Sequence, residues 1–212
     1  MNVSVFTASG SLKLNVRTTQ IEALITAGGG GGAGVAATSR EGQVWIGGGG
    51  GASTTLLIRS AVAAGGTLTI TVGSGGTPGN GTTDGGSGGY SFVNGSSPLS
   101  VPGVSGGRGG RGGAGGAAGT GSDGGLFYTN FGGSDGEAGT VIGGNSPLWM
   151  GGRGGGSFWG DSQPFSPYEA WDAARSAPGA GGSGGVAIDL DGTVCPGAPG
   201  ASGLVIIREY CI

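Results

Sequence analysis

The sequence contains no histidine, few charged residues and only two cysteines. Charged residues make up 10% of its 212 residues, and the net charge is −3. Metal ions of the zinc type are held by clusters of histidine, cysteine and carboxylate side chains, which this composition does not offer. A net negative chain is also poorly suited to bind a phosphate backbone. We therefore expect no metal site and no nucleic-acid partner.

Long apolar stretches are absent as well. No window approaches the roughly 18 apolar residues that a transmembrane helix requires. The first ten residues, MNVSVFTASG, carry no basic region of the kind that opens a signal peptide. We expect neither a membrane span nor a secretory leader in this sequence.

The two cysteines are Cys195 and Cys211, close together near the end of the chain. They could form a disulfide that closes a short loop. Two free thiols are equally compatible with a protein made in a reducing cytosol. The sequence leaves both alternatives open.

Glycine is what the chain has in abundance, with 59 residues. The stretch Gly106–Ala117 reads GGRGGRGGAGGA, in which a Gly-Gly-X triplet occurs four times in succession. A period of three fits neither the α-helix nor the β-strand, but it is the period of the polyproline-II helix. Two of the three faces of such a helix carry glycine and therefore no side chains. Neighbouring backbones can approach these faces closely and pair their N–H and C=O groups. Candidate neighbours are the glycine runs 28–34, 47–51, 151–156 and 179–185.

A disordered linker is the usual alternative for glycine-rich sequence. Hydrophobic residues nevertheless make up 35% of this chain, whereas disordered chains combine low hydrophobicity with high charge. We therefore predict a packed bundle of polyglycine-II helices in the middle of the protein.

Segments with the alternating pattern of β-strands bracket the glycine region at both ends. They are residues 3–7, 12–16, 20–27, 43–46, 52–63, 67–72, 89–93 and 203–210. The turn Ala64-Gly65-Gly66 predicts that 52–63 and 67–72 form a hairpin. The last strand is expected to pair with the N-terminal sheet. The predicted fold is mainly β with bundled polyglycine-II helices, in a single domain over 1–212.

An aromatic insert occupies residues 148–178, and six of the fourteen aromatic residues lie in it. Aromatic faces stack on sugar rings and fill the centres of protein interfaces. The insert is therefore a candidate receptor-contact surface, and the alternative is a core or an interface with another subunit. The candidate residues are Trp149, Phe158, Trp159, Phe165, Tyr168 and Trp171.

The same insert contains the one helix that we expect, near 167–176. Ser166 would be its N-cap, Pro167 would occupy the first turn, and Glu169 would complete a capping box. The helix would end before Pro178 and Gly179.

Two motifs suggest an enzyme, but neither has the context that its chemistry requires. Residues 185–194, GVAIDLDGTV, resemble the first motif of haloacid-dehalogenase phosphatases, but the only lysine, Lys13, lies far upstream of them. Asp189 and Asp191 are better explained by a turn. Residues 119–124, GTGSDG, match the GxGxxG motif of dinucleotide-binding proteins, but no strand is predicted before them and no helix after them. We expect no enzymatic activity and no cofactor.

The order of strands and glycine runs resembles a known family. The chain reads VFTASGSLKLNV, ALITAGGGGGAG, GGGGGASTTLLIRSAVAAGGTLTITVGSGG, GGYSFVNG and finally GASGLVIIREY. This order is similar to that of the glycine-rich domain at the ends of bacteriophage tail-fibre and related virion proteins. The composition is also similar to that of the glycine-rich tip adhesins of T-even-type phages. The insert at 148–178 departs from the common pattern.

The resemblance implies a virion protein, assembled in the bacterial cytoplasm, at or near a tip that contacts the host. Its expected partners are other tail or fibre proteins, and a host surface polysaccharide or outer-membrane protein. It would form a homo-oligomer or dock on a trimeric fibre. The alternative is a purely structural virion component, such as a neck or head fibre, a decoration protein or a tail-assembly protein.

Overall fold

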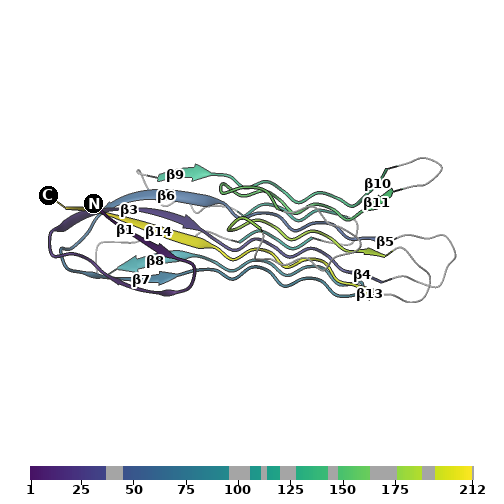
Figure 1. Cartoon of the computed structure of the whole chain (residues 1–212), viewed down its shortest axis with the longest axis horizontal. Coiled ribbons are helices and arrows are strands. Elements are labelled where there is room, and N and C mark those ends of the chain that lie inside the picture. Colours follow the sequence, from purple (N-terminus) through teal and green to yellow (C-terminus); the bar gives the residue numbers. More distant parts are fainter. Residues whose placement is uncertain are drawn as a thin grey trace.

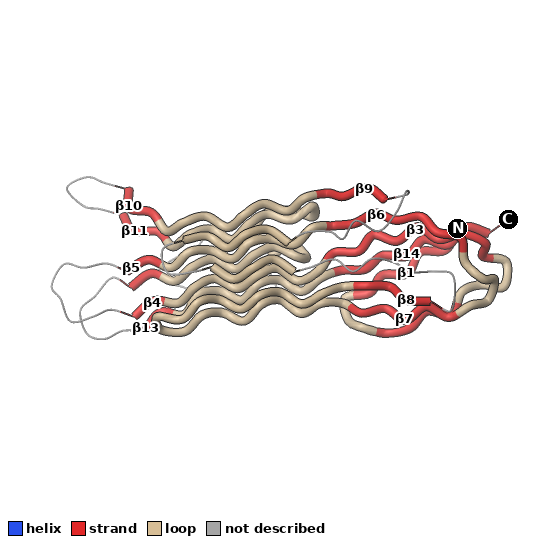
Figure 2. Tube along the Cα trace, turned by 180° about the vertical axis from the view of Figure 1, so that it is seen from behind, coloured by secondary structure: helices blue, strands red, loops and turns tan. Residues whose placement is uncertain are grey.

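A computed structural model describes residues 1–36, 45–95, 106–110, 114–119, 128–142, 148–162, 176–187 and 194–211. The fold is mainly β with antiparallel sheets, and the described part contains no helix. The helix expected near 167–176 lies outside these ranges except for Ser176. The molecule is elongated: strands gather at the end that carries both termini, and glycine-rich segments run side by side through the middle (Figure 1). Short strands occupy the opposite end, as the view from behind also shows (Figure 2).

The larger sheet lies at the end with the termini, which we call the sheet end. It has five antiparallel strands in the order β1-β14-β3-β6-β9. The prediction that the last strand pairs with the N-terminal sheet is confirmed, because β14 lies between β1 and β3. The bounds are β1 Asn2–Phe6, β3 Thr18–Thr26, β6 Thr55–Ala61, β9 Tyr128–Phe131 and β14 Leu204–Cys211.

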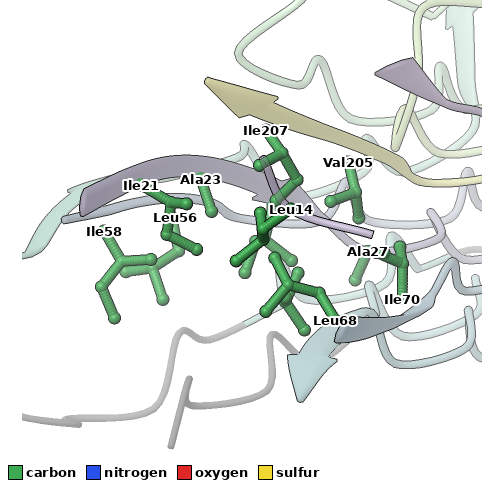
Figure 3. Close-up of a cluster of buried hydrophobic side chains, with 12 residues drawn as sticks. Leu14, Ile21, Ala23, Ala27, Leu56, Ile58, Leu68, Ile70, Val205 and Ile207 are labelled. Carbon is green, nitrogen blue, oxygen red and sulfur yellow. The ribbon is translucent and has the colours of Figure 1, made fainter. Parts of the chain in front are cut away.

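A second, three-stranded sheet packs on one face of the first. It contains β2 (Gly10–Lys13), β7 (Thr67–Thr71) and β8 (Phe92–Gly95), with β7 in the centre. The hydrophobic core lies between the two sheets, and Figure 3 shows its side chains pointing toward one another. The core residues recur at every second position of their strands, because every second residue of a strand faces the same side of the sheet. The core residues are Leu14, Ile21, Ala23, Ile25, Ala27, Leu56, Ile58, Leu68, Ile70, Val93, Val205 and Ile207.

The hairpin predicted for 52–63 and 67–72 does not form. β6 pairs with β3 and β9, whereas β7 pairs with β2 and β8 in the other sheet. Gly65, with φ of 64°, supplies the left-handed turn that the sequence predicts, but this turn carries the chain from one layer to the other. β1 and β2 are separated between the sheets in the same way. The two sheets bury their apolar faces against each other in one core. This burial therefore decides the strand partners here, and the sequence neighbours β6 and β7 do not pair.

Backbone hydrogen bonds hold the glycine segments together and recur at every third residue. Along segment 28–34 the N–H groups donate to three other segments in rotation, over 2.8–3.1 Å. The first neighbour is segment 83–89, whose Gly89, Gly86 and Thr83 carbonyls accept from Gly28, Gly31 and Gly34. The second is segment 198–201, whose Ala201 and Ala198 carbonyls accept from Gly29 and Gly32. The third is segment 48–51, whose Gly51 and Gly48 carbonyls accept from Gly30 and Ala33.

The carbonyl groups of segment 28–34 follow the same rotation toward three further segments. They accept from N–H groups of residues 107 and 110, 76 and 79, and 182 and 185. Segment 47–53 is surrounded in a similar way, since Gly47, Gly50 and Ser53 donate to Gly185, Gly182 and Gly179. Pairing thus extends around each of these two segments, whereas in a sheet it is confined to one plane.

Close contact explains why the centre of this stack is glycine. A β-carbon added at Gly50 would collide with the carbonyl oxygens of Gly30 and Gly31, which belong to a neighbouring backbone. Backbone cannot give way as the end of a flexible side chain can. The bare faces that the Gly-Gly-X pattern predicts are therefore used for backbone contact.

Three strand pairs lie at the end of the molecule opposite the termini, which we call the distal end (Figure 1). β4 (Val35–Ala36) pairs with β13 (Val194–Cys195), and β5 (Trp45–Ile46) pairs with β12 (Val186–Ala187). β10 (Thr140–Ile142) pairs with β11 (Leu148–Met150). Each strand continues directly from a glycine segment, so the stack determines where these pairs lie.

Candidate functional site

The distal end is the first candidate site, because three connections between strands start and finish there. They are residues 37–44, 143–147 and 188–193, and the described strands on either side of each lie at this end (Figure 1). Asp189 and Asp191 of the phosphatase-like motif belong to the third connection and lie outside the described residues. The topology thus brings three described strand pairs from distant parts of the sequence to the same end of the molecule.

Of the six aromatic residues predicted as a site, the structure describes Trp149, Phe158 and Trp159, and Trp149 lies apart from the other two. Trp149 lies in β11 at the distal end, where it pairs with Val141 of β10. Phe158 and Trp159 follow segment 151–156, which returns the chain to the sheet end. Phe165, Tyr168 and Trp171 lie outside the described residues.

Phe158 and Trp159 instead join Phe131 in a cluster beside the larger sheet. The ring centroids of Phe131 and Phe158 are 4.5 Å apart, and Phe158 meets Trp159 edge-on with centroids 5.1 Å apart. Phe158 is 45% exposed. Sequence reasoning missed Phe131 because it lies outside the insert, and the aromatic stretch 127–131 was the only signal that could have found it.

Two buried threonines hold this cluster on the sheet. The indole Nε1 of Trp159 donates to Thr26 Oγ1 over 2.8 Å, and Thr26 Oγ1 lies 2.7 Å from Thr55 Oγ1 of the neighbouring strand. Thr26 and Thr55 are fully buried, and Phe131 is opposite Thr55 in the β6–β9 register. The cluster therefore sits on the outer face of the larger sheet, the face opposite the three-stranded sheet.

A buried carboxylate lies on the same outer face. Glu22 of β3 accepts from Arg59 Nε of β6 over 2.8 Å and from Arg208 Nη1 of β14 over 2.6 Å. Burial raises the pKa of Glu22, but the hydrogen bonds and positive charges of Arg59 and Arg208 outweigh it and leave the pKa below its ordinary value. This row of three side chains ties three adjacent strands together.

Apolar side chains fill the space between this row and the aromatic cluster. Register places Val5, Ile206, Leu24 and Leu57 in one row across the outer face, with Val3 in the next row beside Arg208. Val3 is 52% and Val5 59% exposed. We call this surface, with Phe158, the outer apolar face. Val3 and Val5 lie side by side along β1, and exposed apolar side chains in such an arrangement are typical of interaction surfaces.

The cysteines lie at opposite ends of the molecule, and both are free. Cys195 is in β13 at the distal end, whereas Cys211 ends β14 at the sheet end. The structure therefore contains two free thiols, and the alternative of a disulfide between Cys195 and Cys211 is not found. Within the described ranges no group of His, Cys, Asp and Glu side chains is arranged to hold a metal ion. The same ranges contain no helix long and apolar enough to cross a membrane.

The chain belongs to the glycine-rich domain family, whose model matches residues 7–210. The match covers every described strand except β1 (Asn2–Phe6), with β14 matched up to Tyr210. No curated protein matches the chain.

Proposed function

We propose that this chain is a bacteriophage virion protein, a tail-fibre or tail-tip adhesin that contacts the host cell surface. The observation that carries the proposal is the long stack of paired backbones, which ends in three strand pairs at the distal end. Binding residues are commonly carried on loops that a rigid scaffold positions. The expected receptor is a surface polysaccharide or an outer-membrane protein.

The proposed scaffold is a bundle of polyglycine-II helices. Three features support this assignment: the hydrogen bonds recur every third residue, they extend around each inner segment, and the neighbours run in both directions. Segments 83–89 and 198–201 run antiparallel to 28–34, whereas 76–79 and 107–110 run parallel to it. A helix of three residues per turn directs successive N–H groups about 120° apart, which produces this rotation.

The proposed attachment to the virion is at the sheet end. The outer apolar face leaves Val3, Val5 and Phe158 substantially exposed, and its burial against another virion protein would remove that surface from water. The partner would be a tail or fibre protein, such as a trimeric fibre, or further copies of this chain. The distal end would then point away from the attachment.

A purely structural virion component is the second candidate. The outer apolar face favours it, because a subunit enclosed between others needs interfaces and no receptor site. Both candidates are non-enzymatic. They differ in whether the distal end is exposed on the particle.

Competition for adsorption tests the proposal. An excess of purified protein is expected to slow attachment of the phage that carries this chain to its host. Replacement of residues 37–44 by an equally long Gly-Ser sequence should abolish the competition. The control variant Lys13→Ala/Arg17→Ala, changed at the sheet end, should compete as well as the wild type. An excess of folded wild-type protein that leaves adsorption unchanged would rule out the adhesin and favour the structural component.

A further inference from the structure

A trough runs along the side of the glycine stack, between segments 84–90 and 114–119. It consists of two adjoining cavities of about 480 and 540 Å³, which share Ser87, Arg108 and Ala117. Segment 106–110 forms its floor. Cavities of a few hundred Å³ are of the size that holds small ligands.

The three-residue period of the stack determines what lines the walls. Asp84, Ser87 and Tyr90 follow one another at steps of three and border one side of the trough. Ala114 and Ala117, also three apart, border the other side. One wall therefore presents a carboxylate, a hydroxyl and a phenol ring in a row. Asp84 lines only the 540 Å³ cavity and Tyr90 only the 480 Å³ cavity. The described residues of the other wall are alanine and glycine.

The floor is held rigidly from several directions. Gly107 donates to Gly28, and it accepts from Gly88 of the adjacent wall segment. The backbone N–H of Arg108 donates to Ala117, and its carbonyl accepts from Gly51. The backbone of Arg108 is thus fixed while its side chain is exposed in the middle of the trough.

These groups define the chemistry of a ligand. The ring of Tyr90 is 65% exposed, and an exposed aromatic face stacks on a sugar ring. The Ser87 hydroxyl can exchange hydrogen bonds with sugar hydroxyls. The Arg108 guanidinium matches a carboxylate, phosphate or sulfate group with paired donors. We propose that the 480 Å³ cavity, which Tyr90, Ser87 and Arg108 line and Asp84 does not, binds an acidic saccharide, with a sugar ring on Tyr90 and the acidic group at Arg108.

This inference goes beyond the proposed function, because binding in the trough does not depend on a receptor at the distal end. The experiments that would contradict the proposed function and the saccharide site are also different. Adsorption tests the distal connections in the whole phage, whereas the trough is tested with the purified chain and a defined oligosaccharide.

The experiment measures binding of trigalacturonate and of maltotriose by saturation-transfer NMR and calorimetry. Trigalacturonate is expected to bind, and maltotriose at least tenfold more weakly. Arg108→Gln should weaken trigalacturonate binding at least tenfold, and Tyr90→Ala should weaken binding of both probes. The matched control is Arg153→Gln, an exposed arginine in segment 151–156 outside the trough, which should leave binding unchanged. Melting temperatures near the wild-type value would show that each variant is folded.

Failure of the wild-type protein to bind either probe would overturn the proposal. So would equal binding of the two probes together with no effect of Arg108→Gln. An equal loss in Arg108→Gln and Arg153→Gln would also contradict it, because that result indicates general charge attraction and no defined site.

Discussion

At the scale of single residues, glycine in the stack is required by contact between backbones. The neighbours of Gly50 lie so close that a methyl group has no room. Ala33 and Ala52, in the same segments, are fully buried and still carry a methyl group. The requirement therefore belongs to particular positions and does not extend to the whole segment.

The variant Gly50→Ala is expected to lose about 3 kcal/mol or more of unfolding free energy, because the new methyl group overpacks against fixed carbonyls. Gly132→Ala is the matched control, since a β-carbon there meets nothing within 4 Å. It should be neutral or stabilising by up to about 1 kcal/mol, through the reduced entropy of the unfolded chain. Thermal unfolding followed by circular dichroism measures both. Equal effects of the two substitutions would contradict close backbone contact in the stack.

Glu22 gives a prediction about pH. Its pKa is lowered in the folded protein, so its contribution to stability is complete above its unfolded pKa of about 4.3 and is lost as the pH falls through the lower folded value. The variant Glu22→Gln should therefore be less stable than the wild type by about 1 kcal/mol above pH 5, as for partly exposed ion pairs. The difference should shrink as the pH falls below the unfolded pKa of the carboxyl group.

Urea denaturation at a series of pH values measures this difference. Glu137→Gln is the control, because Glu137 is exposed and has no ion-pair partner within the described residues. It should show no such change with pH. A Glu22→Gln difference that stays constant from pH 7 to pH 3 would mean that the ionised carboxylate does not contribute.

At the scale of elements, periodicity predicted most of the strands but not all of their partners. Thr67–Thr71 alternates strictly between threonine and apolar residues, whereas Leu204–Cys211 opens with four apolar residues in a row; both are strands. The period of three in 106–117 agrees with hydrogen bonds that recur every third residue. The partner of β6 could not be predicted, because a tight turn joins strands of one sheet or of two, and the common core decides between them.

Neighbours in the stack were beyond prediction for a related reason. Glycine runs carry no side chains that would distinguish one neighbour from another, so nothing in 28–34 identifies 83–89 as its partner. The aromatic cluster could not be predicted either. Phe158 and Trp159 are neighbours in the sequence, but Phe131 reaches them from a strand whose position depends on the pairing of β9 with β6.

Insertions into segment 28–34 test the proposed threefold helix. One glycine inserted after Gly30 would move the methyl group of Ala33 to the place of Gly34, where a β-carbon meets the carbonyl of Gly79. Three glycines would leave only glycine at these places and advance the chain by one full turn, about 9 Å. The single insertion should therefore destabilise the protein more than the triple insertion, by about 2 kcal/mol.

Melting temperatures of the two insertion variants provide the measurement. The triple insertion displaces β4, so a modest loss relative to the wild type is expected there. A single insertion that is as stable as the triple one would contradict a period of three.

At the scale of the whole molecule, the two ends are suited to different tasks. Short strand pairs lie at the distal end, whereas the sheet end presents the outer apolar face. Backbone hydrogen bonds in several directions join the two ends through the described glycine segments. A stack of this kind keeps a fixed distance between an attachment surface and a contact surface.

The double variant Val3→Ser/Val5→Ser tests the attachment surface. Both side chains are more than half exposed, so their replacement should change the melting temperature only slightly. Incorporation into phage particles should fall sharply, because the interface would lose the apolar area that is most exposed in the free protein. Quantitative immunoblotting of purified particles measures incorporation.

Val16→Ser is the matched control, because Val16 is 77% exposed at the same end but lies outside the outer apolar face. It should be incorporated like the wild type. If the double variant is incorporated normally, the outer apolar face is not the attachment surface. Loss of incorporation in both variants would indicate that the particle is sensitive to any polar change at this end, and that the specific contact lies elsewhere on it.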